Sequence, residues 1–275
     1  MRIDSHHHFW IFDPVRDAWI NDEMQEIKRD FLPSDLEPVL KEHGFDGCVS
    51  VQADQSEAQN DFLLGFAKEH PFIKGIVGWV DLQSNAIEER LAYYAEEPLL
   101  KGFRHVLQGE AQRDFMLRPA FKNGISLLGK YGFTYDILIF PDQLKFSEEL
   151  VKAFPNQKFV IDHIAKPEIK NQKMNGWDTD IRAIAQHENV FCKVSGMVTE
   201  ADFKGWKPQD FEPYLDVIFQ SFGTKRLMYG SDWPVCNVAG GYTKALNILE
   251  NYTEKLSENE KAQFFGANAV GFYNL

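Results

Sequence analysis

Short runs rich in Val, Ile, Phe and Tyr recur along the chain, and this composition is typical of β-strands. Eight such runs stand out, at residues 2–4, 47–52, 73–80, 102–106, 135–140, 158–162, 190–194 and 226–229. Most neighbouring runs are separated by roughly 30 residues, which is the length of one strand followed by one helix. The spacing therefore predicts a repeating order of strand and helix.

Amphipathic patterns lie between these runs, with apolar residues at the positions i, i+3 and i+4 that share one face of a helix. Pro33 and Ser34 fit the start of the first helix, and residues 178–180 (Asp-Thr-Asp) are expected to cap the helix that follows them. Strands that alternate with helices predict a parallel sheet. The patterns occupy residues 36–40, 62–67, 87–91, 144–154, 181–185, 211–219 and 245–249.

Eight strand–helix units predict the α/β class and a closed (β/α)8 barrel rather than an open sheet. An open doubly wound sheet often has a glycine-rich turn after its first strand, whereas residues 6–10 contain no glycine. The length of 275 residues suits one barrel domain, residues 1–275. Residues 9–31 form the longest irregular stretch, and we expect this loop to cover the active-site face.

The charge balance is acidic, with 29 Lys and Arg against 41 Asp and Glu and a net charge of −12. A surface of this kind argues against nucleic acids and anionic membranes as partners. Cys48, Cys192 and Cys236 are widely spaced and form no C-x-x-C motif, which argues against a disulfide framework. The first residues lack the apolar run of a signal peptide. We therefore expect a cytoplasmic protein with a small-molecule partner, and a homo-oligomer is compatible with this composition.

Titratable residues stand at the predicted carboxyl ends of several strands, where barrel enzymes place their catalytic groups. His6 and His8 are two apart, so on an extended strand their side chains share one face while His7 points away. Two such imidazoles can bind one metal ion or donate to one oxygen. His163 follows a later strand, and Asp232 follows the last one, where it either activates water or caps a helix.

Arg104 ends the fourth strand, and its guanidinium can clamp a substrate oxygen or form a structural ion pair. Trp10, Trp79 and Trp233 are candidates for the wall of a pocket or for ordinary core positions. Ser195 ends the seventh strand, but no G-x-S-x-G motif surrounds it, which argues against a serine nucleophile.

These residues resemble the amidohydrolase superfamily, and within it the sugar-lactonase branch. The resemblance spans nearly the whole chain and includes a C-terminal helix over about residues 258–273. It rests on IDSHHHFW at residues 3–10, RDFLP at 29–33, GWVDL at 78–82, GFRH at 102–105, DHIAKP at 162–167, GSDWP at 230–234 and NA-x-x-FY at 268–273.

The resemblance implies a barrel that hydrolyses a cyclic ester. By position, His6, His8 and His163 would surround the lactone carbonyl, Asp232 would activate water, and Arg104 would contact the substrate. Members with two metal ions carry a bridging Lys or Glu on strand 4 and a His on strand 5. This chain has Arg104 on strand 4 and no histidine on strand 5, so we expect no two-metal centre. Either no metal is required, or the three histidines and Asp232 bind a single divalent ion, most naturally Zn²⁺.

A neutral aldonolactone, such as L-fucono- or L-rhamnonolactone, fits these residues better than a dicarboxylate, because Arg104 and Lys166 are too few cations for the latter. Gln52 and Asp81 are expected to bind hydroxyl groups, and Trp10 to stack on the ring, with Trp79 and Trp233 nearby. Two alternatives stay open: a metal-dependent decarboxylase of the same superfamily, which would release carbon dioxide, and a barrel that binds a sugar lactone without turnover.

Overall fold

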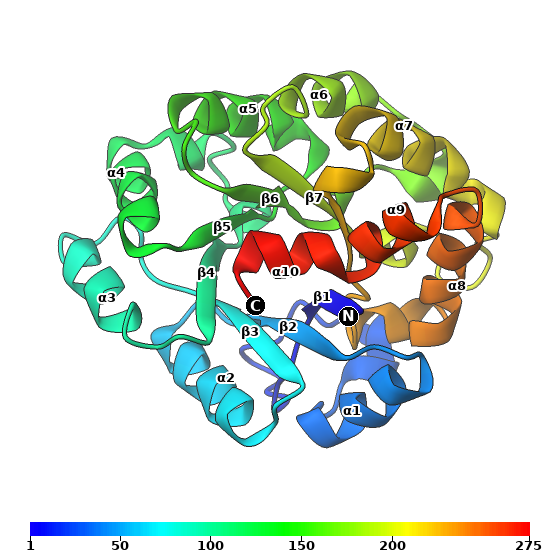
Figure 1. The fold of residues 1–275 in the computed structure, drawn as a ribbon, viewed down its shortest axis with the longest axis horizontal. Coiled ribbons are helices and arrows are strands. Elements are labelled where there is room, and N and C mark those ends of the chain that lie inside the picture. The colour runs from blue at the N-terminus through cyan, green and yellow to red at the C-terminus, as the bar shows by residue number, and fades with distance from the viewer.

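The computed structural model describes all residues from 1 to 275. Eight parallel strands form one sheet in the order of the sequence, and helices surround it (Figure 1). The barrel closes where the first strand meets the segment that follows the last one, since the His8 N–H donates to the Trp233 carbonyl at 2.7 Å and the Asp232 N–H to the His6 carbonyl at 2.8 Å. The predicted (β/α)8 barrel is therefore confirmed. The strands are β1 (Ile3–His7), β2 (Gly47–Val51), β3 (Ile73–Gly78), β4 (Leu100–His105), β5 (Thr134–Ile137), β6 (Phe159–Ile161), β7 (Val190–Val194) and β8 (Leu227–Tyr229).

Ten α-helices accompany the strands, and none is long and apolar enough to cross a membrane. Each of the seven predicted patterns lies in one of them to within one residue at either end, and residues 258–273 are helical throughout, with a π-helical turn at Gln263–Ala267. The helices are α1 (Pro33–Glu42), α2 (Glu57–Glu69), α3 (Ile87–Tyr94), α4 (Pro119–Leu128), α5 (Leu144–Ala153), α6 (Trp177–Ile184), α7 (Glu212–Phe222), α8 (Tyr242–Thr253), α9 (Glu258–Ala262) and α10 (Asn268–Tyr273).

The structure corrects the predicted start of α6. The helix begins at Trp177, so Asp178 and Asp180 lie in its first turn instead of capping it. Gly176 precedes the helix with a φ of 83°, and this left-handed residue brings the chain into the helix earlier than the Asp-Thr-Asp pattern indicated. The two carboxylates still lie where the helix dipole favours negative charge.

The core has two parts. The larger part lies between the strands and the surrounding helices, and the smaller part fills the barrel. Inside the barrel, Val77, Val160 and Met228 pack against Phe272 and Tyr273 of α10. Figure 1 shows α10 lying across the end of the barrel at which the strands begin. This end is therefore closed by apolar packing, and the opposite end is left for the chemistry.

Candidate functional site

A cavity of about 520 Å³ opens at the carboxyl ends of the strands. His8, Arg104, His163 and Asp232 lie in its wall. The segment 9–31 supplies Trp10, Trp19 and Met24 to the same cavity, as expected for a loop on this face. The segment is pinned at both ends, because the backbones of Trp10 and Phe31 exchange two hydrogen bonds of 2.9 and 3.1 Å.

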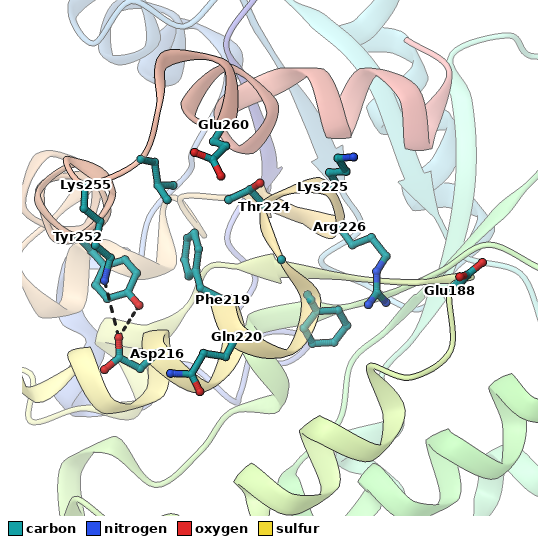
Figure 2. Close-up of a pocket in the computed structure, with 13 residues that line it drawn as sticks. Glu188, Asp216, Phe219, Gln220, Thr224, Lys225, Arg226, Tyr252, Lys255 and Glu260 are labelled. Carbon is teal, nitrogen blue, oxygen red and sulfur yellow. Dashed lines mark hydrogen bonds and ion pairs between the residues drawn. The ribbon is translucent and has the colours of Figure 1, made fainter.

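A larger hollow of about 860 Å³ lies elsewhere, among α7, α8, α9 and the turn at Thr224–Arg226 (Figure 2). The turn directly precedes β8, so the hollow is at the amino ends of the strands, where barrels place stabilising residues. Figure 2 shows the Asp216 carboxylate paired with Tyr252 and Lys255, at 2.6 and 3.8 Å. No histidine lines this hollow, and the cavity with the histidines is the candidate active site.

His6 and His8 are brought together by β1, as predicted. Their Nε2 atoms are 3.2 Å apart. Asp232 faces the same point, since its Oδ1 lies 3.5 Å from Nε2 of His8 and 4.0 Å from Nε2 of His6. His8 lines the cavity, whereas His6 is fully buried beneath it. Gly230 makes room for His6, because a Cβ at residue 230 would lie 2.7 Å from the Cβ of His6.

His163 reaches the same group from a turn at Asp162–Ala165, and its Nε2 lies 3.9 Å from Oδ1 of Asp232. Residues 163–166 all have positive φ values between 49° and 58°, a costly conformation for residues other than glycine. The turn is held by Trp177, whose indole N–H donates to the Ile164 carbonyl at 2.8 Å. The hydroxyl of Ser195 lies 2.9 Å from Nδ1 of His163 and orients the ring.

Burial controls the charges of the site. Burial lowers the pKa of His6 and of His163 well below 6.5, so both imidazoles are neutral at pH 7. Burial alone would raise the pKa of Asp232, but His163, His8 and Lys166 outweigh it and the pKa falls below 3.8. Asp232 is thus an ionised carboxylate among imidazoles, an arrangement suited to taking a proton from water.

The donor set also fits a single cation. Nε2 of His6, Nε2 of His8 and a carboxylate oxygen of Asp232 lie within 4.8 Å of one another, and so do donors of His6, Asp162 and His163. Ligands of a tetrahedral zinc ion lie about 3.3 Å from one another. The separation of 3.2 Å between the two Nε2 atoms matches that spacing.

A buried ionic network beneath the histidines was missed by the sequence analysis. Nη1 of Arg104 donates to Asp162 at 3.0 Å, and Nζ of Lys193 lies 3.1 Å from the same carboxylate. Lys193 also pairs with Asp136, which accepts a hydrogen bond from the Tyr273 hydroxyl at 2.9 Å. The sequence did contain one indication of this network, because Lys193 lies inside the predicted strand at 190–194. Strands of a parallel barrel are mostly apolar, and a buried lysine is rare unless it is paired with other charged groups.

The structure brings together only part of the predicted substrate-binding set. Trp10, Arg104 and Lys166 line the cavity with the catalytic candidates. Four others lie outside it. Gln52 donates to the Arg104 carbonyl at 3.2 Å, and the Trp79 indole reaches His105 at 3.4 Å.

The other two also have local contacts. Asp81 is exposed and accepts a hydrogen bond from the Gln83 N–H at 3.0 Å. Trp233 is buried against Phe9 and Phe31, with ring centroids 6.1 and 5.2 Å away. All four residues follow the last residue of their strand, so the alternation of side chains along a strand does not fix where they point.

The fold and the site together define an enzyme of the (β/α)8-barrel class with a carboxylate and histidines at the carboxyl ends of the strands. The chain belongs to the amidohydrolase family, whose model, described as Amidohydrolase, matches residues 3–275. The resemblance seen in the sequence is thereby confirmed. The chain is 35% identical to an L-fucono-1,5-lactonase from Burkholderia multivorans, and the alignment covers all of this chain and 96% of that protein.

Solved structures agree. The crystal structure of an amidohydrolase from Burkholderia multivorans with bound zinc superposes with a TM-score of 0.97 at 34% identity, covering 100% of this chain and 99% of the other. A 5-carboxyvanillate decarboxylase from Novosphingobium aromaticivorans has a TM-score of 0.73 at 14% identity, covering 100% of this chain and 96% of the other. At this identity the likeness shows a shared fold and carries no statement about the reaction.

Proposed function

We propose that the protein is a lactonase that opens the cyclic ester of a neutral sugar lactone to the aldonic acid. The observation that carries the proposal is the Asp232 carboxylate within 3.5–4.0 Å of the Nε2 atoms of three histidines. The similarity to an L-fucono-1,5-lactonase over the whole chain supports the same reaction.

Asp232 acts as the base. It takes a proton from water while the water oxygen bonds to the carbonyl carbon of the lactone. The carbonyl becomes a tetrahedral oxyanion, and the bond from carbon to the ring oxygen then breaks. Asp232 returns the proton to the departing ring oxygen, which leaves as a hydroxyl group of the open acid.

His6, His8 and His163 stabilise the oxyanion by hydrogen bonds through Nε2. Nδ1 of His8 lies 2.8 Å from the Val51 carbonyl and must donate to it, so Nε2 of neutral His8 has no proton. His8 therefore donates to the oxyanion only while it holds the proton that Asp232 has taken from water, since Oδ1 of Asp232 lies 3.5 Å from Nε2 of His8, whereas neutral His6 and His163 donate directly. The carbonyl oxygen replaces His8 as the acceptor from His6.

A single divalent cation, with zinc as the best fit, is proposed to be held by His6, His8 and Asp232, with His163 beside it. When bound, such an ion would supply a Lewis acid that polarises the lactone carbonyl. The fit supports one such ion, and we propose no second metal.

The cavity suits an uncharged substrate because its cations are already paired. Arg104 is bonded to Asp162 and to the Gln52 carbonyl, and Lys166 lies 3.3 Å from Glu200. Carboxylates at Asp54, Glu200 and Asp232 add negative charge to the wall. An anionic dicarboxylate would meet no unpaired cation there, whereas the hydroxyls of an aldonolactone find acceptors. We propose L-fuconolactone and L-rhamnonolactone as the first candidates and Trp10 as the stacking surface.

The test is a screen of neutral and anionic lactones with a pH indicator, using the wild type and Asp232→Asn, before and after chelation. The expected result is acid release from a neutral sugar lactone that falls about 100- to 10,000-fold in Asp232→Asn. If acid is still released after chelation, the histidines act as direct hydrogen-bond donors. If chelation stops acid release and added zinc restores it, the histidines act as metal ligands. The absence of acid release in all conditions, with carbon dioxide released from an aromatic acid, would contradict the proposal.

We propose a cytoplasmic location because the three cysteines are unpaired and buried, as is usual in a reducing compartment.

A further inference from the structure

Lys193 is fully buried inside the barrel, where it hydrogen-bonds Asp136 and His6 and lies close to Asp162. Its ammonium group pairs with Asp136, lies 3.1 Å from Oδ1 of Asp162, and lies within hydrogen-bond distance of Nδ1 of His6 at 3.2 Å. A lysine has three N–H donors and no acceptor, so it can only donate to His6. Nδ1 must then carry a lone pair.

The other ring nitrogen of His6 faces a matching acceptor. Nε2 of His6 is 3.2 Å from Nε2 of His8. Because Nδ1 of His8 donates to the Val51 carbonyl, Nε2 of neutral His8 is an acceptor. A proton on Nε2 of His6 therefore completes a chain from Lys193 through His6 to His8.

The opposite tautomer is less well supported. It would place the proton on Nδ1 and direct it to Oδ1 of Asp162, 3.3 Å away. That oxygen has no hydrogen-bond partner, so the contact is close without having the required geometry. The remaining contact in its favour is Nη1 of Arg104, which carries two N–H groups: one donates to Asp162 at 3.0 Å, and the other faces Nε2 of His6 at 3.3 Å. In that tautomer, however, the Nε2 lone pairs of His6 and neutral His8 would face each other at 3.2 Å with no proton between them. The opposite tautomer would also place the Nδ1 proton against the ammonium group.

We propose that, when no cation is bound, Lys193 is a positioning residue that fixes the ring proton of neutral His6 on Nε2, the nitrogen that faces His8 and Asp232 and that would have to lose this proton to ligate an ion. The lysine acts through His6 and does not touch the substrate. Asp136, held by Tyr273, anchors the lysine from below, so the C-terminal helix supports the tautomer of a residue in the site. Only the kinetic consequence depends on the proposed lactonase function.

The tautomer is read directly by long-range ¹H–¹⁵N correlation spectra of the ¹⁵N-histidine-labelled protein, ligand-free and dialysed against a chelator. His6→Gln identifies the signals of His6. We expect the proton on Nε2 in the wild type and on Nδ1, facing Asp162, in Lys193→Met. A proton on Nδ1 in the wild type, or an unchanged tautomer in folded Lys193→Met, would overturn the proposal.

Two further variants keep the test decisive. Lys166→Met removes a lysine of the same cavity that does not contact His6, and it must leave the tautomer unchanged. Should Lys193→Met fail to fold because Asp136 is left unpaired, Asp136→Asn with Lys193→Met removes the buried carboxylate and gives the same spectral test.

The kinetic arm is separate. On the lactone identified by the screen, Lys193→Met should lower kcat about 100- to 1000-fold with little change in KM, as expected when one oxyanion donor is lost. An unchanged kcat would contradict the role of the tautomer in catalysis. If no lactone is hydrolysed, the proposed function fails while the spectra still decide the assignment of His6.

Discussion

An asparagine at residue 163 would keep part of the contacts that hold His163. His163→Asn therefore tests catalysis with little disturbance of the fold. The Ser195 hydroxyl orients its ring, and Nε2 projects toward Asp232. His163→Asn should lower kcat about 100- to 1000-fold because one oxyanion donor is lost. The thermal midpoint should change little. Initial rates on the best lactone and circular dichroism melting check the two expectations, and a folded variant with most of its activity would refute the role.

His7 gives a contrasting prediction about stability. The ring is fully buried against Phe9, and neither nitrogen has a hydrogen-bond partner. Because an unsatisfied buried polar group costs about 1–3 kcal/mol, His7→Phe should raise the free energy of unfolding by roughly 1–2 kcal/mol at neutral pH. Urea unfolding measures the change.

The matched control is His105→Phe. The ring of His105 is also packed on a phenylalanine, Phe115, but its nitrogens are bonded to Trp79 and Glu110. His105→Phe strips these partners and should destabilise the fold. A loss of stability in both variants would show that His7 has a partner after all.

At this scale, the sequence identified the residues that stand at strand ends and missed those inside the barrel. His6, His8, His163 and Asp232 converge because parallel strands bring their carboxyl ends to one face. Lys193 could not be assigned, because a charge inside a barrel depends on partners from other strands. Gln52 and Trp79 lie outside the cavity because the direction of a side chain depends on where its strand ends, which the sequence places only within a few residues.

The turn after β7 packs directly on the turn after β6, so a change in one turn should move a catalytic residue in the other. Gly196 has a φ of 60°, and a Cβ there would lie 2.5 Å from Nδ1 of His163. Gly196→Ala must therefore push the imidazole away from Asp232. A displacement of about 1 Å can cost roughly 100-fold in rate, so kcat should fall by about that factor.

Gly132 provides the control for Gly196. Its φ of 78° is also left-handed, but no atom lies within 4 Å of an added Cβ. Gly132→Ala should cost a similar 1–2 kcal/mol of backbone strain and leave kcat unchanged. Chemical unfolding of both variants measures the cost of backbone strain, and kcat of both variants measures the effect of displacing the ring of His163. Equal kcat values would mean that the ring of His163 adapts to the new methyl group.

Among the elements, α4 was the one barrel helix that the pattern did not reveal. Its buried Phe121, Ile125 and Leu128 have helical spacing, but Gly124 in the middle is a poor helix former. The glycine is needed because a Cβ there would overlap with the Leu82 carbonyl oxygen, closer than van der Waals contact allows. Tertiary packing overrides local propensity at this position. β1 extends through His6 and His7, because pairing with β2 and with the segment that follows β8 satisfies a backbone whose side chains are not typical of strands.

Burial of ionisable groups makes the stability of the whole molecule depend on pH. Burial lowers the pKa values of His6, His7 and His163 well below 6.5. Below pH 6.5 the unfolded chain binds protons at these residues and the folded chain does not, so acid favours unfolding. Burial also raises the pKa values of Asp4 and Asp136 from 3.8 to about 6. Between pH 6 and 4 the folded state binds protons there, which works in the opposite direction.

The three histidines are opposed by the two aspartates and by Glu200, whose pKa burial raises from 4.5 by a smaller shift. The free energy of unfolding should therefore fall on acidification between pH 6 and 4, by at most about 1.4 kcal/mol for each pH unit. Below pH 4 the loss should steepen, because neighbouring charges hold the pKa values of Asp162 and Asp232 below 3.8, and these carboxylates must then be protonated.

Urea unfolding at a series of pH values measures the slope, and His7→Phe tests its origin. Since this variant removes one of the three histidines, the profile between pH 6 and 4 should become nearly flat. Asp4→Asn removes one of the opposing groups and should steepen the profile by about one proton. A wild-type stability that is constant or rises on acidification through this range would mean that the buried histidines gain protons in the folded state. The neutral imidazoles on which the proposed oxyanion site depends would then not exist there.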